Sequence, residues 1–95
     1  MPSAILDVPA VLAPTLGGRR TLDLEYDAGA TVGALLDRVG AGHPVFARRI
    51  RTETGAVRRF VNVFVGQDNI RDLAGLDTPV PDGARILVIQ SVAGG

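Results

Sequence analysis

One stretch decides the fold of this chain of 95 residues, and it closes the sequence: Arg85-Ile86-Leu87-Val88-Ile89-Gln90-Ser91-Val92-Ala93-Gly94-Gly95. Residues 85–90 are apolar at odd and even positions alike, which favours a central strand covered on both faces. Glycine has no Cβ, so two terminal glycines can enter a channel too narrow for other residues. We therefore interpret residues 92–95 as a flexible reactive tail and residues 1–91 as the domain that presents it; ordinary disorder of a chain end is the simpler alternative.

The composition of the whole chain excludes several functions. Ninety-five residues make one domain, and a formal net charge of zero argues against a nucleic-acid partner. The chain has no cysteine and one histidine, so we expect no metal site and no catalytic thiol. The N-terminus lacks the pattern of a signal peptide, and no apolar stretch approaches the roughly 20 residues of a membrane span. We expect a cytoplasmic protein without membrane contact.

All ten basic residues are arginine, and lysine is absent. A coding bias is the simpler cause; the alternative is that a chain with an activated carboxyl end avoids acylating its own lysines. Five of the arginines gather at positions 48, 49, 51, 58 and 59. We expect a solvated face there, with partner docking as the alternative.

The first third of the chain predicts an antiparallel hairpin. Residues 4–8 form a short strand with Ala4, Leu6 and Val8 on one face, and Pro9 weakens further pairing because it cannot donate to a ladder. A turn cluster at 14–18 ends in two glycines. The stretch 19–25 then alternates polar and apolar residues, as a second strand does.

A helix follows from Thr31, whose side chain can cap the first turn. Apolar residues recur with helical spacing on one face of this helix, at Val32, Leu35, Leu36 and Val39. Gly40 and Gly42 are expected to end it, and residues 45–50 to add a short helical turn. The single histidine, His43, is interpreted as a solvated loop residue.

The second half predicts a loop and two further strands. The polar stretch 51–59 reads as a loop, and 60–65 as a central strand rich in β-branched and aromatic residues. A turn at 66–69 precedes a short strand at Ile70, and Leu73 and Leu76 are expected to anchor an irregular connection. These elements predict an α+β fold: a mixed sheet of about five strands, with one main helix across one face and the first and last strands paired in parallel.

The chain resembles the ubiquitin-like β-grasp sulfur carriers of the MoaD and ThiS group. The resemblance rests on the strand and turn of residues 60–68, on Pro81-Asp82-Gly83 before the last strand, and on the closing Val92-Ala93-Gly94-Gly95. Gly17-Gly18 and residues 59–62 look most like the CysO subgroup, which feeds sulfide to cysteine synthesis.

The resemblance implies a protein co-substrate rather than an enzyme. In such carriers an E1-like activating enzyme uses ATP to adenylate the terminal carboxylate, here that of Gly95. A sulfur donor then displaces AMP, and the resulting thiocarboxylate delivers sulfide to a biosynthetic enzyme that makes cysteine, a cofactor or a sulfur-containing natural product. The resemblance implies no bound cofactor and a monomer when free. Two alternatives stay open: a ubiquitin-like modifier joined through Gly95 to target lysines, and a plain β-grasp interaction module.

The strand patterns also predict a core and a docking surface. The side chains expected to be buried are apolar and share the inward face of their elements: Leu6, Val8, Leu22, Leu24, Val32, Leu35, Leu36, Val39, Val61, Val63, Val65, Ile86 and Val88. One helix covers one sheet face, so the opposite face should gather a partner-binding patch of Phe60, Asn62, Phe64, Leu87 and Ile89. The alternative is that the 51–59 loop folds over these residues.

Overall fold

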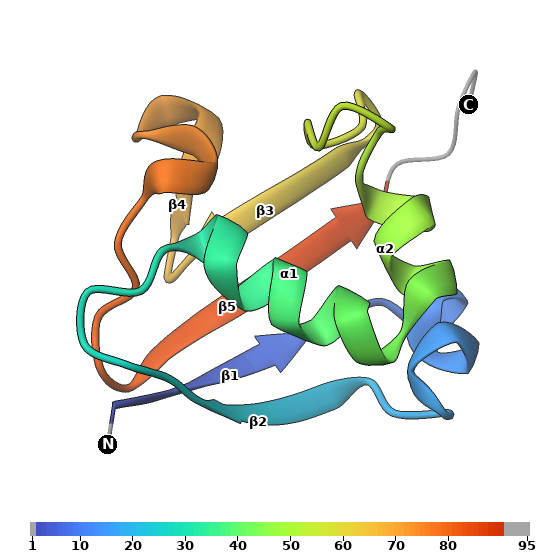
Figure 1. Cartoon of the computed structure of the whole chain (residues 1–95), viewed down its shortest axis with the longest axis horizontal. Coiled ribbons are helices and arrows are strands. Elements are labelled where there is room, and N and C mark those ends of the chain that lie inside the picture. Colours follow the sequence, from blue (N-terminus) through green and yellow to red (C-terminus); the bar gives the residue numbers. More distant parts are fainter. Residues whose placement is uncertain (1, 91–95) are drawn as a thin grey trace.

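The structure, a computed structural model, describes residues 2–90. Its elements are five β-strands, two α-helices and three short 3₁₀ helices (Figure 1). In chain order they are β1 (Ser3–Asp7), η1 (Ala10–Leu16), β2 (Thr21–Glu25), α1 (Val32–Gly42), α2 (Pro44–Ile50), β3 (Val61–Val65), β4 (Asp68–Asn69), η2 (Ile70–Asp72), η3 (Gly75–Asp77) and β5 (Ala84–Gln90).

The strands form one mixed sheet in the order β2-β1-β5-β3-β4. The last strand, β5, lies in the middle, parallel to β1 and antiparallel to β3. Both expectations for this strand, its central position and its parallel pairing with the first strand, are confirmed. The apolar run 85–90 occupies the place where a strand needs apolar side chains on both faces.

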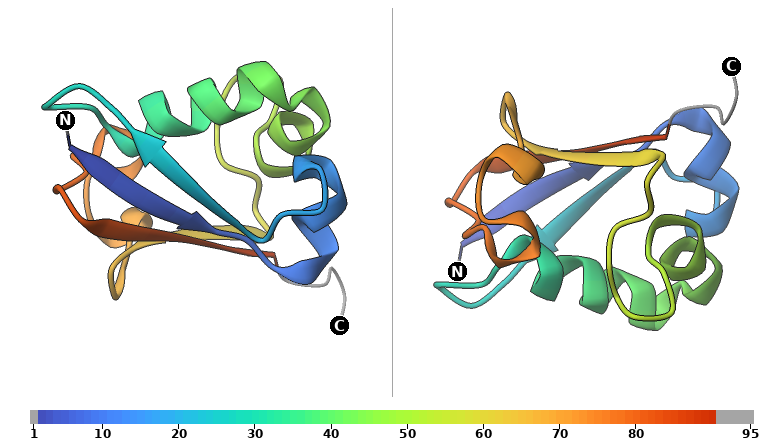
Figure 2. Two further views of the ribbon diagram at one scale, coloured as in Figure 1. Left: turned by 90° about the horizontal axis from the view of Figure 1, so that it is seen from below. Right: turned by 90° about the horizontal axis from the view of Figure 1, so that it is seen from above.

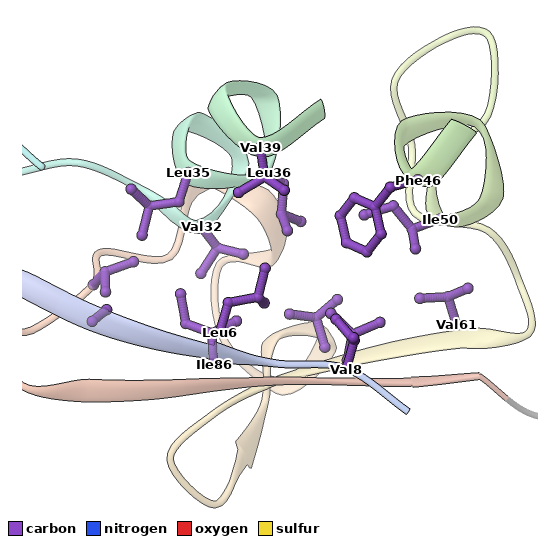
Figure 3. Close-up of a cluster of buried hydrophobic side chains, with 14 of the residues drawn as sticks. Leu6, Val8, Val32, Leu35, Leu36, Val39, Phe46, Ile50, Val61 and Ile86 are labelled. Atoms are coloured by element: carbon purple, nitrogen blue, oxygen red, sulfur yellow. The ribbon is translucent and has the colours of Figure 1, made fainter. Parts of the chain in front are cut away.

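Both α-helices cover the same face of the sheet, and the core lies between them and the strands (Figure 2). Thr31 caps α1 as predicted, since its side-chain oxygen accepts from the N–H of Ala34 at 3.2 Å. The four predicted apolar side chains of this helix are buried against the sheet (Figure 3). Of the thirteen side chains predicted for the core, ten are buried.

The other three, Leu22, Leu24 and Val65, are only half-buried. The two leucines pack against the margin of the core from β2, an edge strand. Val65 is the last residue of β3, just before the turn that leads into β4. The alternation placed their side chains on the correct face, but an alternating pattern does not say how far the helices extend over it.

The predicted end of the helix is partly wrong. Helix α1 continues through Gly40 to Gly42, and α2 is a full helix that buries Phe46 and Ile50. Gly40 serves the approach of α2, because a Cβ at this position would lie 2.9 Å from the Cβ of Ala47. His43 joins the two helices and is half-buried, with Nδ1 3.1 Å from the carbonyl oxygen of Val39, rather than a solvated loop residue.

The connection between β1 and β2 is also larger than the predicted turn. The two strands pair in antiparallel as expected, but η1 lies between them and buries Leu12 and Leu16. Gly17 and Gly18 follow with φ of 69° and 88°, the left-handed region that favours glycine. The predicted turn glycines are therefore correct, whereas the core contribution of η1 was missed.

Two expectations between β3 and β5 are wrong. Ile70 begins η2 and is buried, while the short strand β4 lies just before it. Leu73 does not anchor the connection, because it is 47% exposed. Leu76 does pack against the core, and it lies so close to α1 that a Cβ at Gly33 would be 3.0 Å from the Leu76 carbonyl oxygen.

Tyr26 joins the end of β2 to the segment before β5. Its side chain is 2% exposed, and its hydroxyl donates toward the carbonyls of Pro81 at 2.8 Å and Val80 at 3.0 Å. Burial raises the pKa of the Tyr26 hydroxyl, and the nearby carboxylate of Asp82 adds to the effect. No pattern in the sequence predicted this contact, because its partners lie 54 and 55 residues farther along the chain.

Candidate functional site

The sheet has one face that α1 and α2 leave open (Figure 2). Four of the five predicted docking residues belong to the strands β3 and β5 of this sheet. Phe64 lies directly opposite Leu87, and Asn62 directly opposite Ile89, on neighbouring strands β3 and β5. Ile89 is 40% exposed, and the other three are half-buried. We name Asn62, Phe64, Leu87 and Ile89 the open-face patch. The alternation of β3 and β5 alone was sufficient to predict it.

Phe60, the fifth predicted docking residue, lies just before β3. Its side chain is 45% exposed, and the Arg59 guanidinium stands 5.6 Å from the centre of its ring. A cation over an aromatic face at this distance is an attractive contact. Phe60 is thus available at the surface, and its ring is paired with an arginine.

The 51–59 loop does not cover the open-face patch; it folds on the helix side of the sheet (Figure 2). Arg51 forms an ion pair with Asp37 of α1, and its Nε donates to the carbonyl of Gly55 at 2.8 Å. Arg58 donates from Nε to the carbonyl of Arg48 at 2.7 Å. Two members of the predicted basic cluster therefore hold the loop against the helices.

A polar network borders the patch on the β4 side. The Oδ1 of Asn62 accepts from the Nδ2 of Asn69 at 3.2 Å and from the guanidinium of Arg71. The same guanidinium donates to the carbonyl of Arg58 at 3.1 Å. These bonds fix the side-chain amide of Asn62, so the patch has one polar member held in a defined orientation.

A second polar pair crosses the open face on the β1 side. The carboxylate of Asp7 accepts from the guanidinium of Arg85 and from the hydroxyl of Thr21 at 3.0 Å. The bond from Arg85 holds the pKa of the Asp7 carboxyl below its usual value, against the opposing effect of partial burial. The pair raises the pKa of Arg85 in turn. The parallel pairing of the first and last strands was the signal that could have predicted this contact.

Beside this pair the open face is hollowed at the C-terminal end of β5. Strand β1 pairs with β5 only as far as Asp7 opposite Leu87, whereas β5 continues to Gln90. The gap left by β1 is a shallow pocket, which we name the notch; it is lined by Asp7, Pro9, Arg20, Thr21, Ile89 and Gln90, among others.

Val92, Ala93, Gly94 and Gly95, the predicted tail, lie outside the described residues, as does the predicted boundary between domain and tail. Within residues 2–90, no group of histidine and acidic side chains could hold a metal ion. No helix in this same part of the chain is long and apolar enough to span a membrane.

The sheet order, the central β5 and the helices on one face define a ubiquitin-like β-grasp protein, as predicted. The chain belongs to the ThiS family, whose model matches residues 7–95. The sulfur carrier protein CysO of Mycobacterium tuberculosis is 29% identical over 92 residues, which cover 95% of this chain and 96% of CysO.

Two solved structures show the same fold. A chain of the BexX/CysO complex of Amycolatopsis orientalis superposes with a TM-score of 0.82 at 30% identity, covering 97% of this chain and 99% of that one. SAMP1 of Haloferax volcanii also gives 0.82, at 28% identity, with 98% and 99% coverage.

Family and relatives together identify a sulfur carrier of the CysO and ThiS kind. Such proteins work with activating and acceptor enzymes, and they are substrates of these enzymes rather than catalysts. The resemblance stated from the sequence is confirmed for the family, the fold and the role as a carrier.

Proposed function

We propose that this carrier holds its sulfur on the carboxylate of Gly95. The carboxylate attacks the α-phosphate of ATP in an E1-like activating enzyme and releases pyrophosphate. A sulfur nucleophile from a donor then attacks the acyl adenylate and displaces AMP. When this nucleophile is hydrosulfide, the new C–S bond replaces the C–O bond to AMP, and loss of the remaining proton leaves a thiocarboxylate. The thiocarboxylate hands sulfide to a biosynthetic enzyme for cysteine, a cofactor or a sulfur-containing natural product. ATP belongs to the activating enzyme, and the carrier itself binds no cofactor.

The order of these steps follows from the chemistry of a carboxylate. A carboxylate resists nucleophilic attack because its leaving group would be oxide, and adenylation replaces this group with AMP. The product has the soft, thiolate-like reactivity that sulfur transfer requires, in a chain that has no cysteine. Gly94 and Gly95 suit entry into narrow active sites because neither has a side chain.

One observation carries the proposal: the open-face patch lies on the same strand that leads toward Gly95. Leu87 and Ile89 are members of both the patch and β5, and β5 ends at Gln90, five residues before Gly95. Five extended residues reach at most about 18 Å. A partner that grips the patch therefore has the carboxylate within reach of its own active site, which supports docking and chemistry by one enzyme.

ATP–pyrophosphate exchange by the activating enzyme of the same organism tests the first step. We expect exchange to depend on the carrier, and Gly95→Ala to slow it without changing the melting temperature, because the added methyl group interferes only inside the partner's channel. Exchange that is absent with the wild-type chain would overturn adenylation. Equal rates for both chains would overturn the channel argument alone.

The second candidate function is that of a ubiquitin-like modifier. The observation in its favour is the likeness to a structure described as small archaeal modifier protein 1 of H. volcanii, at a TM-score of 0.82 and 25% identity. In that case the activated Gly95 would form an isopeptide bond with a lysine of a target protein. Mass spectrometry of the host proteome for lysines carrying the C-terminal residues of this chain distinguishes the two functions.

A further inference from the structure

The backbone of β5 has an unpaired edge at the notch, and the strand register shows where it points. The N–H of Gly66 donates to the carbonyl of Arg85 at 2.9 Å, across the β3–β5 ladder. Bonded and non-bonded residue pairs alternate in an antiparallel ladder. Ile89 therefore turns its backbone groups toward β3, whereas Val88 and Gln90 turn theirs toward the side of β1.

On that side the chain cannot complete the ladder. The N–H of Val8 donates toward β2, so Pro9 is the residue that faces β5. Proline has no N–H to donate, and the Pro9 carbonyl already accepts from the N–H of Leu12 at 2.9 Å. Within residues 2–90, the carbonyl of Val88 and the N–H of Gln90 therefore have no hydrogen-bond partner.

The surroundings of these two groups are largely buried. Val88 is fully buried, and the side-chain Oε1 of Gln90 is also buried without a partner among the residues that the structure describes. Buried backbone groups in folded proteins are paired in the great majority of cases. The notch is therefore an incomplete piece of sheet, because Pro9, which follows in register opposite Ile89, supplies neither of the two missing hydrogen bonds.

The charge at the rim of the notch is positive. The Asp7 carboxylate faces the notch, but Arg85 and Thr21 already bind it. Arg20 lines the same pocket and has no ion pair within residues 2–90; its charge is the smallest of the contributions that lower the pKa of the Asp7 carboxyl. The free charge that an incoming segment meets is therefore that of Arg20, which favours an acidic side chain.

We infer that the notch receives an extended segment of the activating enzyme that carries an acidic side chain. One residue of a strand parallel to β5 supplies both missing groups: its N–H donates to the carbonyl of Val88, and its carbonyl accepts from the N–H of Gln90. A carboxylate on this segment pairs with Arg20. Since Ile89 belongs to the notch and to the open-face patch, the two surfaces are continuous. The inference rests on the proposed adenylation.

Arg20→Glu and Arg19→Glu are the matched test. They are neighbours with the same change in net charge, but only Arg20 lines the notch. Titration calorimetry against the activating enzyme should give a dissociation constant about tenfold higher for Arg20→Glu and within about twofold for Arg19→Glu, the scale of a desolvated charge pair against a rim charge. Matching melting temperatures of the two variants and the wild type show that the fold is retained.

Hydrogen exchange at single amides tests the backbone pairing. The N–H of Gln90 should exchange fast in the free carrier and slowly in the complex, while that of Ile89, bonded to β3, is protected in both. Equal affinity losses for the two arginine variants, or fast Gln90 exchange in the complex, would overturn the inference while leaving adenylation intact. A wild-type carrier that supports no ATP–pyrophosphate exchange would overturn the proposed function and the inference with it.

Discussion

At the scale of single residues, the open face is organised by ionisable and polar side chains that the strand patterns did not reveal. Asp7 is the clearest example, because three strands meet at its carboxylate: its own strand β1, β2 through Thr21 and β5 through Arg85. The alternation predicted that Asp7 faces away from the core. It did not identify its partners, since these depend on the register between strands distant in the sequence.

The first prediction concerns acid stability. The pKa of Asp7 is lowered in the folded state, so its ionised form contributes stability above the unfolded pKa of about 4, and this contribution is lost as the pH falls through the folded pKa. Urea unfolding from neutral to acidic pH should show a smaller acid loss for Asp7→Asn than for the wild type. The difference is modest, because the Arg85 side chain is 60% exposed. Parallel pH profiles would contradict this role.

The second prediction concerns Tyr26, the only tyrosine in the chain. Its pKa is raised in the folded state, so the stability it contributes is complete below the unfolded pKa of about 10 and is lost as the pH rises through the folded pKa. Tyrosinate absorbance should appear at higher pH in the native than in the urea-unfolded protein. Tyr26→Phe should be about 1 kcal/mol less stable than the wild type at neutral pH. As the pH rises through the folded pKa of Tyr26, the variant should lose less stability than the wild type. Coincident titrations would show that the hydroxyl is not held as described.

At the scale of elements, the helical part was predicted in its position but not in its packing. The apolar spacing and the Thr31 cap were sufficient for α1, because both are local signals. The role of Gly40 was not predictable, since a glycine near a helix end has the same sequence appearance whether it stops the helix or admits a neighbour. Only the distance to Ala47 distinguishes these cases.

The third prediction uses two glycines of the same helix. Overpacking of Gly40→Ala against α2 should cost about 1–3 kcal/mol, and the gain in helix propensity of about 1 kcal/mol offsets part of it. The net effect should be a destabilisation of up to about 2 kcal/mol. Gly42→Ala is the control, because a Cβ there has no atom within 4 Å and φ is not positive. It should be neutral or stabilising in the same urea melts. A stabilised Gly40→Ala variant would show that α2 does not approach this closely.

The fourth prediction concerns the open-face patch. Ile89→Asp should weaken binding to the activating enzyme by about tenfold or more, the loss typical of a central apolar contact, while the fold is retained. Val45→Asp is the control: this valine is 46% exposed, close to the 40% of Ile89, but lies in α2 on the opposite side of the molecule. Titration calorimetry of both variants gives the comparison. Equal affinities would place docking elsewhere.

At the scale of the whole molecule, the strand order was easier to predict from the sequence than the 3₁₀ segments that connect the strands. The central β5, its parallel pairing with β1 and the open-face patch follow from patterns of period two, which are strong in these strands. The segments η1 and η3 have no such period, so the buried Leu12 and Leu16 were missed. The notch was predictable only in part. The effect of Pro9 on strand pairing followed from the sequence, whereas the pocket beside Gln90 did not.

Intact-mass spectrometry can show directly whether the carboxylate of Gly95 becomes a thiocarboxylate. The purified chain is incubated with the activating enzyme, ATP and a sulfide source, with Gly95→Ala as a parallel sample. We expect a mass gain equal to the exchange of one oxygen for one sulfur atom, and a smaller gain in the variant. The gain should be lost when an acceptor enzyme takes the sulfur, and alkylation of the thiocarboxylate should block this transfer. The activating enzyme must first be shown to activate another carrier of the family. An unchanged mass of this chain with that enzyme would contradict thiocarboxylate formation, as would a mass gain that fragmentation locates away from Gly95.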